Sequence, residues 1–150
     1  MMIELRLADK KMVYICSPFR ADDDAGMRRN MHRAKMYEDL FSSILGAKCV
    51  APHAHLPNLL DEHNAAHREL GLDFGLKLLE LCDLVLVCGK RISRGMRAEI
   101  FKAQSLGIPV VFVPDPAKYM DEETSATEEE LLKGAVKNAE DKMSARKNVI

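Results

Sequence analysis

The apolar residues of the chain form four short runs, separated by longer segments in which apolar positions recur every three or four residues. The runs lie at residues 12–16, 48–51, 84–88 and 109–113. The last two are continuously apolar, which is typical of strands buried on both faces. Each of the first two is soon followed by a proline, which a central strand does not accommodate. The pattern therefore predicts four strands.

Three intervening segments have the apolar spacing of amphipathic helices. The first follows three aspartates at 22–24 and closes at Gly46, a residue typical of a helix C-cap. The second covers residues 64–82 and is apolar nearly all round, so we expect it to be largely buried. The third runs over residues 94–106 and is capped by Gly107. The apolar positions of the second segment include Leu70, Leu72, Phe74, Leu76 and Leu79.

Strands that alternate with helices are joined by right-handed crossovers and lie parallel in one sheet. We therefore expect an α/β, three-layer domain with a mostly parallel sheet of four to five strands. Residues 114–126 form a polar, acidic connector, after which a capping-box pattern opens a charged C-terminal helix over residues 127–147. The expected organisation is one domain over residues 1–150, with its core at about 12–113.

The 150 residues are 47% hydrophobic and 30% charged, a composition that excludes a disordered or low-complexity chain. Because the net charge is −1, the chain has no global field that would attract a nucleic acid. No apolar run approaches the roughly 18 residues that a membrane span needs, and residues 1–6 lack the apolar stretch of a secretory signal. We therefore expect a cytoplasmic protein that binds neither nucleic acid nor membrane.

The four cysteines are isolated from one another, without a C-x-x-C pair. Cys16, Cys49, Cys82 and Cys88 each lie in or beside an apolar segment. This arrangement indicates neither a zinc site nor a disulfide framework. We expect reduced thiols that pack in the core as small apolar side chains.

Polar and basic residues follow three of the predicted strands, at 17–20, 52–55 and 89–95. Because the carboxyl ends of parallel strands meet at one edge of a sheet, these loops should share one crevice. Hydroxyl and guanidinium donors suit a phosphate group there, whereas the sequence has no Walker or G-x-G-x-x-G motif for a triphosphate or dinucleotide. The candidate anion-binding residues are Ser17, Arg20, Ser93 and Arg94.

Glu99 is a charged residue on the predicted apolar face of the third helix. At 100° per residue, this face is defined by Met96, Ile100, Ala103 and Leu106, and Glu99 falls within it. Glu99 also lies about two turns from the helix start, close to the crevice and to the positive end of the helix dipole. An inward carboxylate is either a structural group held by hydrogen bonds or a reactive one.

Histidines at 53 and 55, and at 63 and 67, have spacings that resemble metal ligands. The second pair would lie on one face of a helix, which leaves a metal-dependent hydrolase as an alternative. The simpler interpretation makes His53 a hydrogen-bonding group of the crevice. His55, His63 and His67 are then polar residues of a loop or a helix surface.

Residues 14–20, 82–87 and 93–100 together resemble the nucleoside 2-deoxyribosyltransferase superfamily. Their sequences are Tyr-Ile-Cys-Ser-Pro-Phe-Arg, Cys-Asp-Leu-Val-Leu-Val and Ser-Arg-Gly-Met-Arg-Ala-Glu-Ile. The resemblance spans about residues 12–113 and is closest to an uncharacterised bacterial and phage branch, similar to deoxynucleoside monophosphate N-glycosidases. An Ala-Pro-His turn and residues 69–72 also match that branch.

The resemblance implies a flavodoxin-like fold that cleaves or transfers at the N-glycosidic bond of a deoxynucleoside or its 5′-monophosphate. Glu99 matches the nucleophile, which attacks C1′ to form a deoxyribosyl ester that water or a second base resolves. We expect neither a cofactor nor a metal. Relatives form dimers or larger oligomers whose neighbouring subunits complete the pocket, so self-association is expected here. The phosphate-binding positions that the resemblance implies are Ser17, Arg20, Ser93 and Gly95. The full set of expected substrate-binding residues also includes Pro18, Phe19, His53, Arg94 and Met96.

One position departs from the superfamily pattern. The relatives carry an Asp eight residues before the Asp that opens the third strand, and counting back from Asp83 gives Gly75. That Asp helps to protonate the leaving base, so the acid here comes from elsewhere, such as Asp73, Tyr14 or His53, or the activity is altered. If the activity is lost, the chain is a non-catalytic nucleotide-binding or regulatory module on the same fold.

Overall fold

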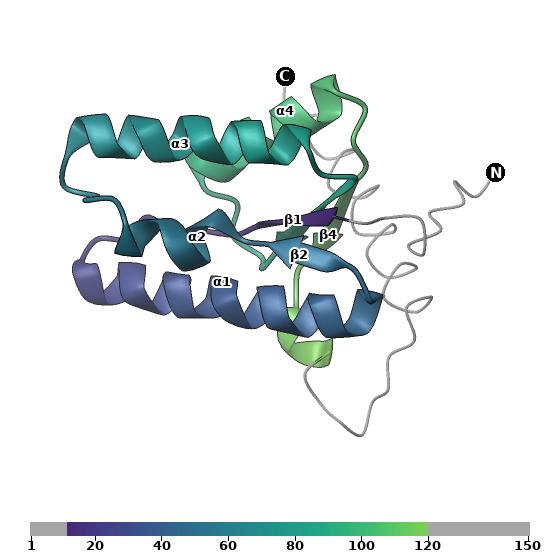
Figure 1. Cartoon of the computed structure of the whole chain (residues 1–150). Helices are drawn as coiled ribbons and strands as arrows, with labels where there is room; N and C mark the ends of the chain where they lie inside the picture. The colour runs from purple at the N-terminus through teal and green to yellow at the C-terminus, as the bar shows by residue number, and fades with distance from the viewer. Residues whose placement is uncertain (1–11, 120–150) are drawn as a thin grey trace, which may run out of the picture.

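The computed structural model describes residues 12–119. Its strands are β1 (Met12–Cys16), β2 (Lys48–Val50), β3 (Leu84–Cys88) and β4 (Val110–Val113). Its longer helices are α1 (Asp24–Leu45), α3 (Ala65–Glu80) and α4 (Arg94–Ser105) (Figure 1). The short helices α2 (Pro52–His55) and η2 (Leu56–Asn58) lie between β2 and α3, and η3 (Pro116–Tyr119) follows β4. The four predicted strands and the three predicted helices are confirmed, each boundary to within two residues.

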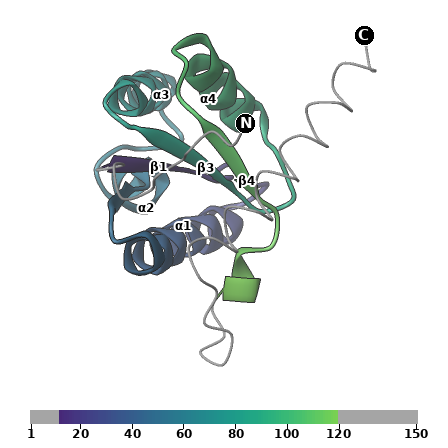
Figure 2. The same ribbon diagram turned by 90° about the vertical axis from the view of Figure 1, so that its right-hand side faces the viewer.

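The described sheet is parallel throughout, in the order β2-β1-β3-β4. α1 covers one face, and α3 and α4 cover the other, which confirms the predicted three-layer α/β arrangement (Figure 2). This is the flavodoxin-like order, in which the chain leaves β1 toward one face and β3 toward the other. Ligands of such folds bind at this switch point, beyond the carboxyl ends of the strands.

The strands separate two apolar cores because successive side chains point to opposite faces. One core lies under α1 and contains Val13, Ile15, Ala34, Phe41, Leu84 and Leu86. The other lies under α3 and α4 and contains Tyr14, Cys16, Leu79, Val85, Val87, Met96 and Ile100. Burial of both faces explains why β3 is continuously apolar in sequence.

Side-chain caps fix where the helices begin beside the strand ends. The Asp23 carboxylate accepts a hydrogen bond from the Gly26 N–H at 2.7 Å, and the Ser93 hydroxyl accepts one from the Met96 N–H at 3.3 Å. These bonds satisfy donors that the first turn of a helix leaves unpaired. At the other end of α1, Gly46 has φ 63° and is the expected left-handed C-cap.

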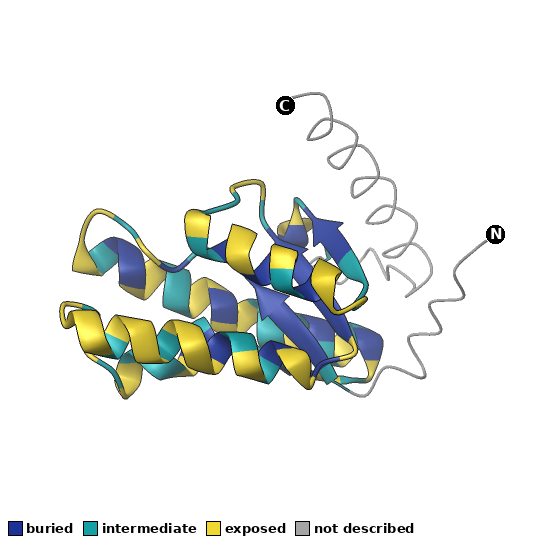
Figure 3. Cartoon of the chain, turned by 90° about the horizontal axis from the view of Figure 1, so that it is seen from above, coloured by how far each residue is buried: buried dark blue, intermediate teal, exposed yellow. Residues whose placement is uncertain are grey.

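The prediction that residues 64–82 are largely buried is wrong. Only Gly75 and Leu79 of α3 are buried, whereas Leu70, Leu72 and Phe74 are each at least half exposed (Figure 3). The reason is geometric, because a helix that lies on one face of a sheet buries only one stripe. Leu106, expected on the inward face of α4, is also exposed, since the helix ends at Ser105.

The expected connector at 114–126 is structured where it is described. Residues 116–119 form η3, and the Tyr119 ring packs against Phe41 with centroids 6.4 Å apart. The rest of the connector and the expected helix over residues 127–147 lie outside the described residues. Within residues 12–119, no helix has the length and apolar character needed to cross a bilayer.

All four cysteines are buried and free, as the sequence predicts. Burial raises the pKa of Cys49 to about 11 and that of Cys82 to about 12. Burial also raises the pKa of Cys16 and of Cys88 well above the ordinary range of a thiol. The thiols are therefore neutral packing groups at physiological pH, and none has the depressed pKa of a nucleophilic cysteine.

Candidate active site

A crevice of about 560 Å³ lies beyond the carboxyl ends of β1 and β2, between α2, α3 and the start of α4. Its volume falls within the roughly 300–1,000 Å³ typical of small-molecule sites. The three loops that the sequence analysis expected to meet all reach this part of the fold. The expected site residues that line the crevice are Phe19, Arg20, His53, Ser93, Arg94, Gly95, Met96 and Glu99.

Glu99 points inward from α4 and is only 5% exposed, in the orientation that the helical spacing predicts. One carboxylate oxygen, Oε1, lies 3.8 Å from the His53 Nε2 atom. The other, Oε2, is buried and has no hydrogen-bond partner among the described residues. An unpartnered buried carboxylate oxygen is costly, so it is typical of a group that meets a ligand rather than a structural carboxylate.

Tyr14 lies beneath Glu99 at the centre of β1. Both residues line a small cavity of about 90 Å³ that also includes His53 and Gly75. Burial raises the pKa of the Tyr14 hydroxyl far above its usual range, and the charge of the nearby Glu99 raises it further. The hydroxyl is therefore protonated at neutral pH and is available as a hydrogen-bond donor beside the carboxylate.

Gly75 brings the backbone of α3 against the Tyr14 hydroxyl. A Cβ atom at this position would lie 3.1 Å from the Tyr14 Oη atom, closer than an ordinary van der Waals contact. The tyrosine hydroxyl thus lies where a side chain at position 75 would begin. The space beside position 75 is consequently filled from β1.

Asp73 is separated from Glu99 in the structure. Its side chain is exposed on α3, and it lines neither the crevice nor the small cavity beneath Glu99. Asp73 and Gly75 are two positions apart on the helix, so their side-chain directions differ by about 200°. Asp73 therefore points away from the space that a side chain at position 75 would occupy. Of the three proton donors considered from the sequence, Tyr14 and His53 are the two beside the carboxylate.

His53 is held in place by the loop after β1. Its ring stacks on Phe19 with centroids 5.3 Å apart and an interplanar angle of 14°. Pro52 opens the short helix α2 directly after β2, which turns His53 toward the crevice. The stack leaves the imidazole partly exposed, with its Nε2 atom on the Glu99 side.

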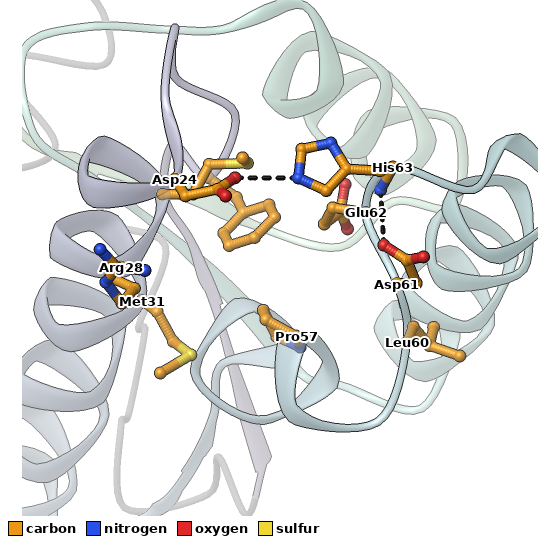
Figure 4. Close-up of a pocket in the computed structure, with 10 residues that line it drawn as sticks. Asp24, Arg28, Met31, Pro57, Leu60, Asp61, Glu62 and His63 are labelled. Atoms are coloured by element: carbon orange, nitrogen blue, oxygen red, sulfur yellow. Dashed lines mark hydrogen bonds and ion pairs between the residues drawn. The ribbon is translucent and has the colours of Figure 1, made fainter.

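The segment between α2 and α3 forms one wall of the crevice and is tied to the start of the chain's first helix. Arg20 Nη1 lies 3.4 Å from a Glu62 carboxylate oxygen, and His63 Nε2 lies 2.9 Å from Asp24 Oδ1. Figure 4 shows the His63 and Asp24 pair across a neighbouring pocket of about 290 Å³. Glu62 is not predictable from the sequence, because no motif surrounds it and only the fold brings it to Arg20.

Ser17 and Pro18 lie outside this crevice, although both were expected to bind substrate. They line a separate cavity on the α1 side of the sheet. Ser17 is 1% exposed, and its hydroxyl oxygen has no hydrogen-bond partner among the described residues. The β1 loop therefore divides its polar groups between two cavities, with Arg20 on one side and Ser17 on the other.

His55, His63 and His67 pair with carboxylates or the backbone. His55 Nε2 lies 3.0 Å from Glu38, and His67 Nδ1 accepts a hydrogen bond from a backbone N–H. His63 precedes Asn64, the N-cap of α3, so the expectation that His63 and His67 share a helical face is wrong. Within residues 12–119, no three His, Cys, Asp or Glu side chains converge as a metal site.

A protein-family model described as a domain of unknown function (DUF7768) matches residues 11–113. No curated protein matches this chain. Among solved structures, a 2-deoxyribosyltransferase from the psychrotolerant bacterium Bacillus psychrosaccharolyticus is similar, with a TM-score of 0.54 and 16% sequence identity. The match covers 69% of this chain and 72% of that chain. The two proteins thus share the α/β fold described above.

Proposed function

This chain belongs to the family of domains of unknown function DUF7768, and from that premise we propose that it cleaves or transfers at the N-glycosidic bond of a deoxynucleoside or deoxynucleoside 5′-monophosphate. The observation that carries the proposal is the buried Glu99 carboxylate, whose Oε2 atom is unpartnered beside a crevice of about 560 Å³. The shared fold with a 2-deoxyribosyltransferase supports the same chemistry.

In the first step, a Glu99 oxygen attacks C1′ of the sugar, and the C1′–N bond breaks. The electron pair of that bond stays on the nitrogen of the base, which takes up a proton as it leaves. A deoxyribosyl ester of Glu99 results. In the second step, water or a second base attacks C1′ and gives up a proton, and the ester bond breaks to restore the carboxylate.

His53 supplies the proton to the departing base in this proposal. Its Nε2 atom lies 3.8 Å from the nucleophile, on the crevice side. Imidazole is the side chain that most often serves as a general acid. Tyr14 is less suited to give up its proton, because burial raises the pKa of its hydroxyl. Tyr14 is instead a positioning residue, whose protonated hydroxyl lines the same small cavity as Glu99.

The crevice also offers donors for a 5′-phosphate. Ser93 and Gly95 lie at the positively polarised start of α4, and Arg94 adds a guanidinium. Arg20 also lines the crevice, but its guanidinium is paired with the Glu62 carboxylate. When a substrate binds, its phosphate would replace Glu62 as the partner of Arg20. A deoxynucleoside monophosphate therefore fits the cationic and hydrogen-bond-donating groups of the crevice at least as well as a deoxynucleoside.

The test is to incubate the protein with deoxynucleosides and their 5′-monophosphates, with and without a second free base, and to follow released and exchanged base by chromatography. Free base without an acceptor indicates a hydrolase, and a new nucleoside indicates a transferase. Saturable binding without turnover, unchanged in Glu99→Ala, would instead favour a non-catalytic nucleotide-binding module. Mass spectrometry of the acid-quenched enzyme should show one added deoxyribosyl group.

Replacing Tyr14 with phenylalanine should lower kcat by about 10- to 100-fold, because the variant lacks the hydroxyl donor that lies beside the Glu99 carboxylate. Because the hydroxyl acts through Glu99, KM should change little. Tyr119→Phe, on the opposite face of the sheet, is the matched control. A loss of the same size in both variants, or a change in KM alone, would contradict a positioning role for Tyr14.

Self-association through α3 and α4 is part of the proposal. Leu70, Phe74 and Phe101 are 58%, 50% and 73% exposed, and α3 also borders the crevice. A second copy packed on these helices would bury the apolar surface and lie next to the site. Leu70→Glu with Phe74→Glu should lower the molar mass measured by light scattering, whereas Met36→Glu on α1 should not. A wild-type monomer at all concentrations would contradict this expectation.

A further inference from the structure

A second cavity, of about 150 Å³, lies at the switch point of the sheet, on the opposite side of the β1 loop from the Glu99 crevice. Its walls come from the loops after β1 and β3 and from α1. None of its lining residues lines the crevice. It is therefore a separate place in the fold, at an edge where α/β sheets bind ligands.

Three cations line this cavity, and no carboxylate does. They are Arg33 on α1 and Lys90 and Arg91 after β3. In the described part of the chain, none of the three forms an ion pair with Asp or Glu. Like charges gathered without a counter-charge repel one another, so an anion placed between them is stabilised.

Ser17 adds an independent observation. Its side chain is 1% exposed and lines the cavity, and its Oγ atom has no hydrogen-bond partner within residues 12–119. A buried hydroxyl without a partner costs about 1–3 kcal/mol. An anion in the cavity would accept that hydrogen bond and remove the cost.

We propose that this cavity binds a phosphate dianion, either free or as the end group of a phosphate monoester. The volume is below the roughly 300 Å³ at which small-molecule pockets begin, so it admits a compact group rather than a whole nucleotide. Lys90 and Arg91 are exposed at the rim, where the organic part of a monoester would extend into solvent. The inference does not depend on the reaction proposed for Glu99.

The first test is calorimetric titration of the full chain with inorganic phosphate and, separately, with glycerol phosphate at constant ionic strength. Arg33→Ala combined with Arg91→Ala should weaken binding by about tenfold or more, since each removes a charge-assisted hydrogen bond. The matched control is Arg29→Ala combined with Arg97→Ala, which removes the same charge from surfaces outside the cavity. If the control weakens binding equally, or if neither ligand saturates the protein, the proposal is overturned.

The two ligands also separate the possible sources of the phosphate. Saturation by inorganic phosphate supports a free ion as an occupant, and tighter binding of glycerol phosphate supports a monoester. Each should displace the other, because the cavity has room for one phosphate group. The affinities should be unchanged in Glu99→Gln, so a failure of the catalytic proposal would leave this result intact.

Ser17→Ala gives a second, structural readout. Because the buried hydroxyl has no described partner, its removal should leave the thermal midpoint of the phosphate-free protein unchanged or raise it. The same substitution should reduce the increase in thermal midpoint that phosphate produces in the wild-type protein. A lower midpoint without phosphate, together with an undiminished phosphate effect, would show that the hydroxyl serves the fold and would overturn its assignment to the anion.

Discussion

Glu99→Gln is expected to lower kcat by roughly four orders of magnitude or more, because an amide oxygen is too weak a nucleophile to form the sugar ester. The substitution keeps the size of the side chain, so binding of a deoxynucleoside monophosphate should be preserved or tightened. Removing a buried charge with an unpartnered Oε2 atom should also leave the thermal midpoint unchanged or raise it. Loss of turnover with folding and affinity kept is the expected combination.

The matched control for this variant is Glu80→Gln. Glu80 is a glutamate at the far end of α3 that pairs with Lys102 at 2.8 Å and lies outside the crevice. Its substitution should leave turnover unchanged. Full turnover by Glu99→Gln would remove the covalent mechanism, even if the fold and the crevice were correct. In that case base release would have to proceed by direct attack of water, without an enzyme ester.

The fold was predictable because its signals are local and periodic. The runs at β1, β2, β3 and β4, and the caps at Gly46 and Ser93, fix both the elements and the direction in which they connect. Four parallel strands then leave few arrangements. The exposure of the apolar side chains of α3 was not predictable in this way. An apolar residue in the sequence does not show whether its side chain packs in the core or lies on an exposed face of the helix.

Glu99 shows how a site residue becomes visible in sequence. A charged residue on an apolar helical face contradicts the pattern around it, and the structure confirms that this carboxylate is inward. The position of Gly75 against Tyr14 had no such signal, because it depends on the approach of α3 to β1. The sequence also did not predict that Ser17 and Arg20 line different cavities. The backbone path of the short loop between them determines on which side of the sheet edge each side chain lies.

The same distinction applies to the walls of the crevice. The pair formed by Arg20 and Glu62 joins residues 42 positions apart, and its geometry is set by the turn that precedes α3. Sequence alone marked Arg20 as a free cation for an anion. The structure gives it a carboxylate partner, which makes Ser93, Arg94 and Gly95 the more direct donors for a phosphate in the crevice.

His53→Gln should lower kcat by about 10²–10⁴-fold, the usual contribution of a general acid. Glutamine keeps a hydrogen-bond donor near Glu99 but has no proton to transfer at working pH. The loss should be largest for substrates whose base leaves poorly without protonation and small for a base that departs as a stable anion. This dependence on the leaving group separates proton transfer from a loss of packing against Phe19.

The matched control for this prediction is His55→Gln. The two histidines are two positions apart on α2, but His55 is exposed and pairs with Glu38 rather than with Glu99. Only His53→Gln should lower kcat by an amount that depends on the leaving base. If His53→Gln slows all substrates equally, His53 only shapes the crevice, and the proton must reach the base from another group or from water.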